Sequence, residues 1–165
     1  MKLALTTDHA GFTALDQLKT FLVGLGHTCV DYGPTAFDEQ DDYPDFMFPA
    51  AQAVADGRCD RAVIMGGSGQ GEAMAANRVS GVRAAVFYGP VTAKTSVDAL
   101  GTTSDDPYEI VKLSRQHNDA NVLSLSSRFL TIDEMKTALT IWLDTPFSGD
   151  ERHARRIAKL DEGQR

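Results

Sequence analysis

The sequence predicts an α/β fold: a doubly wound, Rossmann-like sheet of five parallel strands with helices on both faces. Short apolar runs alternate with segments of helical periodicity along the whole chain, which is typical of a parallel sheet covered on both sides. Polar or glycine-rich segments directly follow the first, third and fifth apolar runs. Ligands bind at such positions, beyond the carboxyl ends of parallel strands.

The predicted strands are short and apolar, and most of them end at glycine, proline or a polar residue. In chain order they cover Lys2–Thr7, His27–Tyr32, Arg61–Met65, Val82–Tyr88 and Asn121–Leu125.

The predicted helices lie between and after these strands. Leucines at helical spacing and the C-cap candidate Gly26 define the first helix. Pro107 suits a first helical turn, and Thr131 or Asp133 caps the helix that follows the last strand. In chain order the helices cover Phe12–Leu25, Tyr43 to about Ala55, Glu72–Arg78, Pro107 to about Gln116, Ile132–Leu143 and Asp150–Glu162.

Bulk composition favours a single globular domain over residues 1–165, with 42% apolar residues. The net charge of −7 argues against a nucleic-acid partner. No apolar run approaches the roughly 20 residues that cross a bilayer, and the N-terminus lacks a signal-peptide pattern. We therefore expect no membrane contact and a cytoplasmic location. Cys29 and Cys59 indicate buried small hydrophobes, not a disulfide or a metal site.

The strongest local signal is the glycine loop, residues 66–72, which joins the third strand to a helix. Its spacing matches neither a Walker A loop nor the dinucleotide fingerprint. Glycines at 67, 69 and 71 let a ligand approach the backbone N–H groups, as in an anion-binding nest. A tight strand-to-helix turn explains the same glycines, so both interpretations stay open.

Glu72 and Ser68 extend the anion-binding interpretation. A glutamate at the rim of a nest is well placed to act as a general base on a carbon whose oxyanion the loop stabilises. It also gains from the helix dipole without any catalytic role. Ser68 either donates to the same oxygen or caps the helix.

Further candidates lie near the other strand ends and in the last helix. Asp8 caps the next helix or, with His9, binds substrate hydroxyl groups. The His117-Asn118-Asp119 turn ends a helix, where a cation is ordinary. Arg128, Arg152 and Arg156 are surface charges or phosphate ligands. The last two lie four residues apart and so share a helix face, with Asp150 and Glu151 as ordinary ion-pair partners.

Taken together, these segments resemble the type B ribose-5-phosphate isomerases and the galactose-6-phosphate isomerase subunits. The matching pieces run in a consistent order over nearly the whole chain: Asp8-His9-Ala10-Gly11, Asp42-Tyr43-Pro44, Gly66 to Glu72, Ala75-Ala76-Asn77-Arg78, Gly81-Val82-Arg83-Ala84, Ser114 to Leu123 and Arg152-His153-x-x-Arg156.

The resemblance implies an aldose–ketose isomerase that works through a cis-enediolate with no metal and no cofactor. It implies Glu72 as the base, because position 66, a cysteine in one branch of the family, is glycine here. Ser68 would relay hydroxyl protons, and His117 would open the furanose ring. The implied substrate-binding residues are Asp8, His9, Gly67, Gly69, Gly71, Asn118, Arg128, Arg152 and Arg156, of which the arginines hold the phosphate. It also implies active sites shared across a homodimer or tetramer, with the C-terminal helix packed on a partner subunit.

One region departs from the family pattern. The motif spacing indicates about 18 extra residues before His117, at about 92–110. Such an insertion could act as a lid, change the sugar accepted or add an oligomer contact. Ribose 5-phosphate is the first expectation for the substrate; four-carbon sugar phosphates, hexose 6-phosphates and an unphosphorylated sugar are alternatives. A non-catalytic sugar-phosphate-binding module and a flavodoxin-like nucleotide-binding protein are the rival classes.

Overall fold

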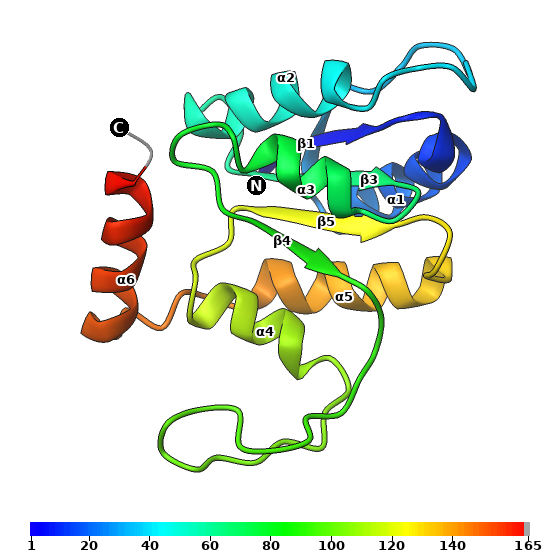
Figure 1. Ribbon diagram of the computed structural model, residues 1–165. Coiled ribbons are helices and arrows are strands. Elements are labelled where there is room, and N and C mark those ends of the chain that lie inside the picture. Colours follow the sequence, from blue (N-terminus) through cyan, green and yellow to red (C-terminus); the bar gives the residue numbers. More distant parts are fainter. Residues whose placement is uncertain (164–165) are drawn as a thin grey trace.

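Five strands form one fully parallel sheet in the order β2-β1-β3-β5-β4, as Figure 1 shows. The computed structural model describes residues 1–163. The strands are β1 (Lys2–Thr7), β2 (Thr28–Asp31), β3 (Arg61–Gly66), β4 (Ala84–Phe87) and β5 (Val122–Ser126). This arrangement confirms the predicted doubly wound α/β class.

Helices cover both faces of the sheet. One layer contains α2 and α3, and the other contains α1, α4 and α5 (Figure 1). The helical elements are η1 (His9–Gly11), α1 (Phe12–Gly24), α2 (Pro44–Ala55), α3 (Gln70–Ala76), α4 (Glu109–Gln116), α5 (Ile132–Asp144) and α6 (Glu151–Glu162). None of the helices within residues 1–163 is long and apolar enough to cross a membrane.

Several predicted boundaries are wrong by one or two residues, for local reasons. Helix α3 begins at Gln70, ahead of Glu72, because Gly69 takes a left-handed conformation with φ +77° and starts the helix early. Strand β4 begins only at Ala84, since the Arg83 N–H donates to the Asn121 side chain at 2.8 Å. Helix α4 begins after Pro107, because the Asp106 side chain holds the preceding turn.

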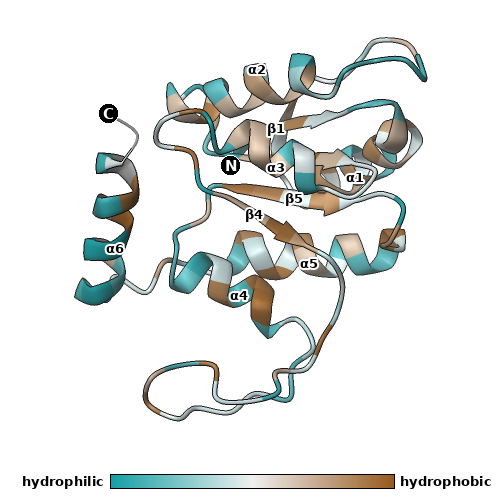
Figure 2. Cartoon of the chain, viewed as in Figure 1, coloured by the Kyte–Doolittle hydropathy of each residue, from teal (hydrophilic) through white to brown (hydrophobic). Residues whose placement is uncertain are grey.

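The two faces of the sheet have separate cores, because side chains alternate along each strand. Leu3 and Leu5 of β1 face α1 and α5, whereas Ala4 between them faces α2. Figure 2 accordingly shows β4 and β5 as mostly hydrophobic. Cys59 is buried in the second core as predicted. Cys29 is only half-buried, because β2 is an edge strand with a neighbour on one side.

Sheet order places a topological switch point between β1 and β3. The chain leaves β1 toward β2 on one side and reaches β3 on the other. Crevices at such switch points bind ligands in open α/β sheets. Asp8 follows β1 here, and the glycine loop follows β3.

Two segments lie away from the sheet. Residues 88–108, between β4 and α4, form a long loop that extends beyond α4 (Figure 1). Helix α6 stands at the opposite edge from the glycine loop and covers neither face of the sheet (Figure 1). Whether a partner subunit covers α6 stays a prediction.

Candidate active site

The glycine loop is held from below by serine side chains at the end of β5. Three hydroxyl groups donate to three loop carbonyl oxygens. The pairs are Ser124 with Gly69 at 2.7 Å, Ser126 with Gly67 at 2.8 Å and Ser127 with Gly66 at 2.9 Å. Because its carbonyl groups are engaged on the protein side, the loop has a single fixed shape.

The loop keeps N–H groups available for a ligand. Those of Gly67, Ser68 and Gly71 have no acceptor among residues 1–163. The Ser68 hydroxyl accepts from the Gln70 N–H at 3.3 Å and so satisfies the first N–H group of α3, although the N-cap residue itself is Gly69. Neither role proposed for Ser68 excludes the other, since the hydroxyl hydrogen remains free to donate.

Glu72 lies in the first turn of α3 and is the buried acid of the site. It is 5% exposed, and its Oε2 atom has no hydrogen-bond partner within residues 1–163. Burial raises the pKa of the Glu72 carboxyl, and the nearby charge of Asp8 raises it further. A carboxylate with an unsatisfied buried oxygen and a raised pKa is suited to accept a proton.

A second acidic group, Asp8, lies beside an ion pair. The Asp8 carboxylate accepts from the Ala10 N–H at 2.9 Å and caps η1, as one of the two interpretations of Asp8 predicts. The His9 ring bonds Asp41 at 2.7 Å through Nδ1, and its backbone N–H donates to the same oxygen. This bond raises the pKa of His9, although burial opposes it. The bond to Asp41 therefore fixes the orientation of the His9 ring and favours its protonated form.

These three side chains also raise the question of a metal. Ligand atoms of Asp8, His9 and Asp41 lie within 4.8 Å of one another, and Asp41 Oδ2 is buried with no partner in residues 1–163. The His9 ring and Asp41 Oδ1 already bond to each other at 2.7 Å, which explains their closeness without a cation. The prediction of a metal-free site stays a prediction.

Arg128 supplies positive charge over the loop. Its backbone N–H donates to the Gly67 carbonyl at 3.3 Å. A Cβ on Gly67 would lie 3.3 Å from the Arg128 guanidinium carbon, so the side chain rests directly on the loop. The Arg128 charge also lowers the pKa of His9. Glu72, Ser68, Asp8, His9 and Arg128 thus lie together at the carboxyl edge of the sheet.

A second cluster forms around α6. The rings of His117 and His153 stack with centroids 4.2 Å apart and an interplanar angle of 11°. Arg152 donates to His153 Nε2 at 3.3 Å and pairs with Asp150 at 3.4 Å. Burial lowers the pKa of His117, and the charges of His153 and Arg152 lower it further. His117 is therefore neutral near pH 7 and able to accept a proton.

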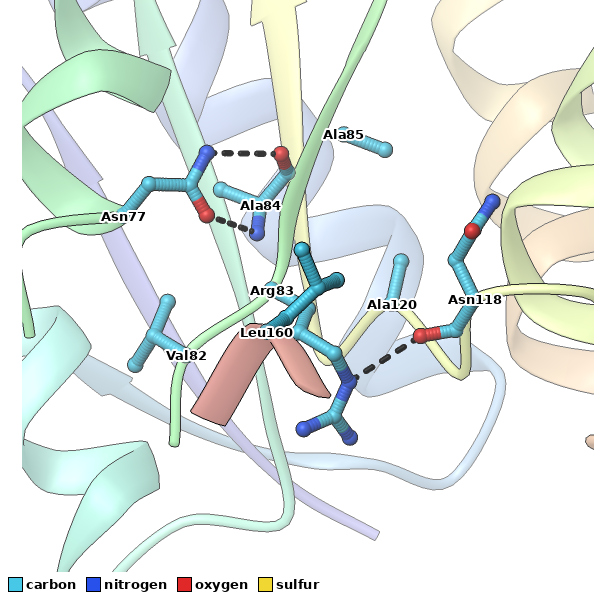
Figure 3. A pocket seen from close by; sticks show the side chains of 8 residues that line it. All are labelled: Asn77, Val82, Arg83, Ala84, Ala85, Asn118, Ala120 and Leu160. Atoms are coloured by element: carbon cyan, nitrogen blue, oxygen red, sulfur yellow. Dashed lines mark hydrogen bonds between the residues drawn. The ribbon is translucent and has the colours of Figure 1, made fainter. Parts of the chain in front are cut away.

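Arg156 and Asn118 complete the predicted residues of this second cluster. Arg156 is exposed on α6, and its guanidinium has no hydrogen bond or ion pair in the described chain. Asn118 lies in the turn after α4, where Asp119 adopts φ +44°. The carbonyl of Asn118 accepts from Arg83 at 3.0 Å, and its side chain lines a cavity of about 390 Å³ beside Leu160 (Figure 3).

The two clusters do not meet within one chain. The glycine loop follows the carboxyl end of β3, whereas His117 and Asn118 precede the amino end of β5. The five residues of β5 alone span roughly 16 Å. One chain therefore carries two separate groups of the predicted site residues, which we call half-sites, at opposite edges of its sheet.

Several residues shape the first half-site in ways that their local sequence did not predict. Asp41 was visible only as part of an acidic loop, with no spacing to mark it as the partner of His9. The Tyr43 ring packs on Gly71, where a Cβ would lie 2.9 Å from Tyr43 Cζ. The serines of β5 sit in an apolar run at alternate positions. That alternation was the available signal, because hydroxyl groups in a buried strand require partners.

These features define a class of protein: a doubly wound α/β domain with a buried carboxyl group next to a nest of N–H groups and an arginine at its rim. A family model described as "Ribose/Galactose Isomerase" matches residues 3–102 and 99–160. The chain belongs to this family. The two matched stretches meet within the segment where the motif spacing predicts extra residues.

Individual relatives and solved structures agree with the family assignment. Ribose-5-phosphate isomerase B of Mycolicibacterium paratuberculosis is 33% identical over 165 residues, which cover 100% of this chain and 92% of the relative. The Escherichia coli protein of the same name is 34% identical and covers 96% of this chain and 93% of its own length. The structure of the Clostridium thermocellum protein has a TM-score of 0.85 at 34% identity, covering 99% and 97% of the two chains.

A further structure was solved with a ligand. Ribose-5-phosphate isomerase B of Mycoplasma genitalium, with bound ribulose-5-phosphate, has a TM-score of 0.83 at 35% identity. The match covers 99% of this chain and 95% of that one.

Proposed function

We propose that this chain is an aldose–ketose isomerase that interconverts ribose 5-phosphate and ribulose 5-phosphate. The observation that carries the proposal is Glu72, a buried carboxyl with a raised pKa and an unpartnered oxygen beside the glycine loop. The names of the relatives and the ligand in the Mycoplasma genitalium structure support the choice of sugar.

The reaction needs one base and an oxyanion site. In the open-chain aldose, the Glu72 carboxylate takes the proton from carbon 2. The electron pair of that bond forms the double bond of a cis-enediolate between carbons 1 and 2. The π electron pair of the carbon 1 carbonyl moves onto its oxygen, which gains a proton, and the carbon 2 hydroxyl loses one. Glu72 then returns the carbon-bound proton to carbon 1, and the oxygen on carbon 2 becomes the ketone. A raised pKa suits both steps, because the same group must accept and then donate.

Other side chains prepare and hold the substrate. The N–H groups of Gly67 and Gly71 stabilise the enediolate oxygens, with Ser68 as the relay for hydroxyl protons. The N–H of Gly69 instead faces the Glu72 carboxylate, so its predicted role toward the substrate passes to its two neighbours in the loop. Asp8 and His9 bind hydroxyl groups of the sugar. Arg128 extends the positive rim toward the phosphate.

The second half-site comes from a partner subunit in this proposal. His117, Asn118, Arg152 and Arg156 are too far from Glu72 to act with it in one chain. A homodimer, alone or paired into a tetramer, would bring the partner's cluster to the glycine loop. The neutral ring of His117 then takes the proton of the anomeric hydroxyl group. The bond between carbon 1 and the ring oxygen breaks, the ring oxygen gains a proton, and the open-chain aldehyde forms. A cytoplasmic location stays a prediction, in keeping with a sugar-phosphate substrate.

A panel of aldose and ketose phosphates with four, five and six carbons tests the proposal. Wild type should interconvert the pentose pair fastest and should exchange the carbon 2 proton with solvent deuterium. Glu72→Gln should lower kcat by about 100-fold or more, because it removes the base. Binding without proton exchange would instead establish a non-catalytic sugar-phosphate module. A near-wild-type rate in Glu72→Gln would refute the mechanism.

A further inference from the structure

The long loop between β4 and α4 is ordered by its own contacts and by α4. Its base closes where the Val91 N–H donates to the Pro107 carbonyl at 2.7 Å. Val97 lies with Ile110 and Leu113 around a small cavity of about 80 Å³ against α4. The segment 91–106 therefore runs back along α4, toward the end of the helix that carries His117.

The tip of this segment is a tight turn built around Asp98. The Asp98 carboxylate accepts from the N–H groups of Leu100 at 2.8 Å and Thr102 at 3.0 Å. The Val97 N–H donates to the Thr102 carbonyl at 2.8 Å, and Gly101 takes φ +85°. The turn thus fixes the Asp98 carboxylate and projects Leu100, whose side chain is 87% exposed in the single chain.

This tip faces the second half-site. Asp98 and Leu100 line a cavity of about 300 Å³ together with His117, Arg152 and His153. The charges also act on one another. A hydrogen bond from the Thr102 side chain is the main cause of the lowered pKa of Asp98, and the positive charge of Arg152 lowers that pKa a little further. Asp98 in turn opposes the lowering of the His117 pKa. A carboxylate and an isobutyl group from the segment therefore border the residues proposed to open the ring and hold the phosphate.

We propose that segment 91–106 is a specificity element, with Asp98 and Leu100 as substrate-selecting residues of the shared site. This inference rests on the proposed function. Asp98 places a second carboxylate, besides Asp150, next to Arg152, so the cavity disfavours ligands with more than one phosphate. The Leu100 side chain fills part of the cavity and cannot form a hydrogen bond with the additional hydroxyl group of a hexose. The pair therefore selects a pentose monophosphate over hexose phosphates and sugar bisphosphates.

The test compares kcat/KM for ribose 5-phosphate with that for an aldohexose 6-phosphate of the same configuration at carbons 2 and 3. Leu100→Ala should shift this ratio toward the hexose by about tenfold, the scale of one or two methylene groups in a pocket. Asp105→Asn is the control for the segment, because Asp105 is exposed and does not line the cavity. An unchanged ratio in Leu100→Ala, with wild type active, would overturn the size selection.

A second arm needs no turnover and tests the charge. Asp98→Asn keeps the side-chain oxygen that the Leu100 and Thr102 N–H groups require, but removes the negative charge. It should bind inorganic phosphate several-fold more tightly than wild type by calorimetry, whereas Asp105→Asn should not. Equal phosphate binding in Asp98→Asn and wild type would remove Asp98 from the site. If the wild type turned over no sugar phosphate, the proposed function would be wrong. Calorimetry with inorganic phosphate would still show whether Asp98 borders the phosphate-binding residues.

Discussion

The Glu72 carboxylate occupies the space that a side chain at Gly66 would fill. A Cβ built on Gly66 would lie 2.7 Å from Glu72 Cγ and closer still to the carboxyl carbon and Oε1. The backbone of Gly66 is not in the left-handed region. Glycine is therefore required at position 66 because a larger residue would collide with the Glu72 side chain. The last residue of β3 thus determines where a side chain in the first turn of α3 can lie. The Glu72 carboxyl group can hold this position only while residue 66 has no side chain.

Substitution of Gly66 should lower kcat far more than it lowers the thermal stability of the protein. In Gly66→Ala the Glu72 side chain has to move away, and a displacement of about 1 Å at a catalytic group lowers kcat by roughly 100-fold. Steady-state kinetics and thermal unfolding together measure the effect. Gly24→Ala is the control, because a Cβ there meets nothing within 4 Å. Full activity in Gly66→Ala would mean that the observed position of Glu72 is not the productive one.

The raised pKa of Glu72 makes a prediction about stability and pH. Its folded-state pKa lies above the unfolded value of 4.5, so the folded protein bears a penalty once pH rises through the folded pKa. Glu72→Gln should therefore raise Tm at pH 8, and the gain should vanish as pH falls below about 4.5.

Glu134 provides the opposite case within the same chain. Hydrogen bonds from Thr131 in the α5 capping box lower the pKa of Glu134. The stabilisation by the ionised Glu134 carboxylate is present above the pKa that this group has in the unfolded protein. It is lost as pH falls through the pKa in the folded protein. Glu134→Gln should thus lower Tm at pH 8 but not at low pH. The same sign for both variants at pH 8 would contradict this account of Glu72.

The serine supports under the glycine loop should matter for stability as well as rate. Ser124→Ala removes one of the two donors to the buried Gly69 carbonyl and leaves the Ala73 N–H at 3.1 Å, so it should cost about 0.5–1.5 kcal/mol of unfolding free energy. The loop should also lose its fixed shape, with a fall in kcat. Denaturant unfolding and kinetics measure the two effects. Ser96→Ala, at an exposed position of the long loop, should change neither.

Two half-sites in one chain predict complementation between inactive variants. Glu72→Gln damages the glycine-loop half and His117→Ala damages the other, so each alone should be nearly inactive. When the two are unfolded together and refolded in equal amounts, half of the dimers contain one intact site. Activity should then recover to about a quarter of the wild-type value. Absence of recovery, with mixed dimers demonstrated by mass, would show that the sites are not shared.

Much of the site follows from local sequence. Spacing of glycines, the acid at the start of α3 and the polar residues after β1 are local features, and the ends of parallel strands fall at one edge of the sheet. The alternation of strand and helix therefore predicted that Asp8, the glycine loop and Arg128 come together. Predicted boundaries were wrong where a side chain took the place of a backbone hydrogen-bond partner. The Arg83 N–H, for example, donates to the Asn121 side chain, so β4 begins one residue later, at Ala84.

What the sequence by itself determined is the fold class, the glycine loop and the identity of its acid, because each depends on residues close together in the chain. Only the tertiary structure decided that Glu72 needs the empty space at Gly66, that Asp41 holds His9 and that Asp98 reaches the His117 cluster. It also decided that His117 stands at the far edge of the sheet from Glu72. These relationships join residues far apart in sequence, and the packing of whole elements, which no local pattern encodes, sets their distances.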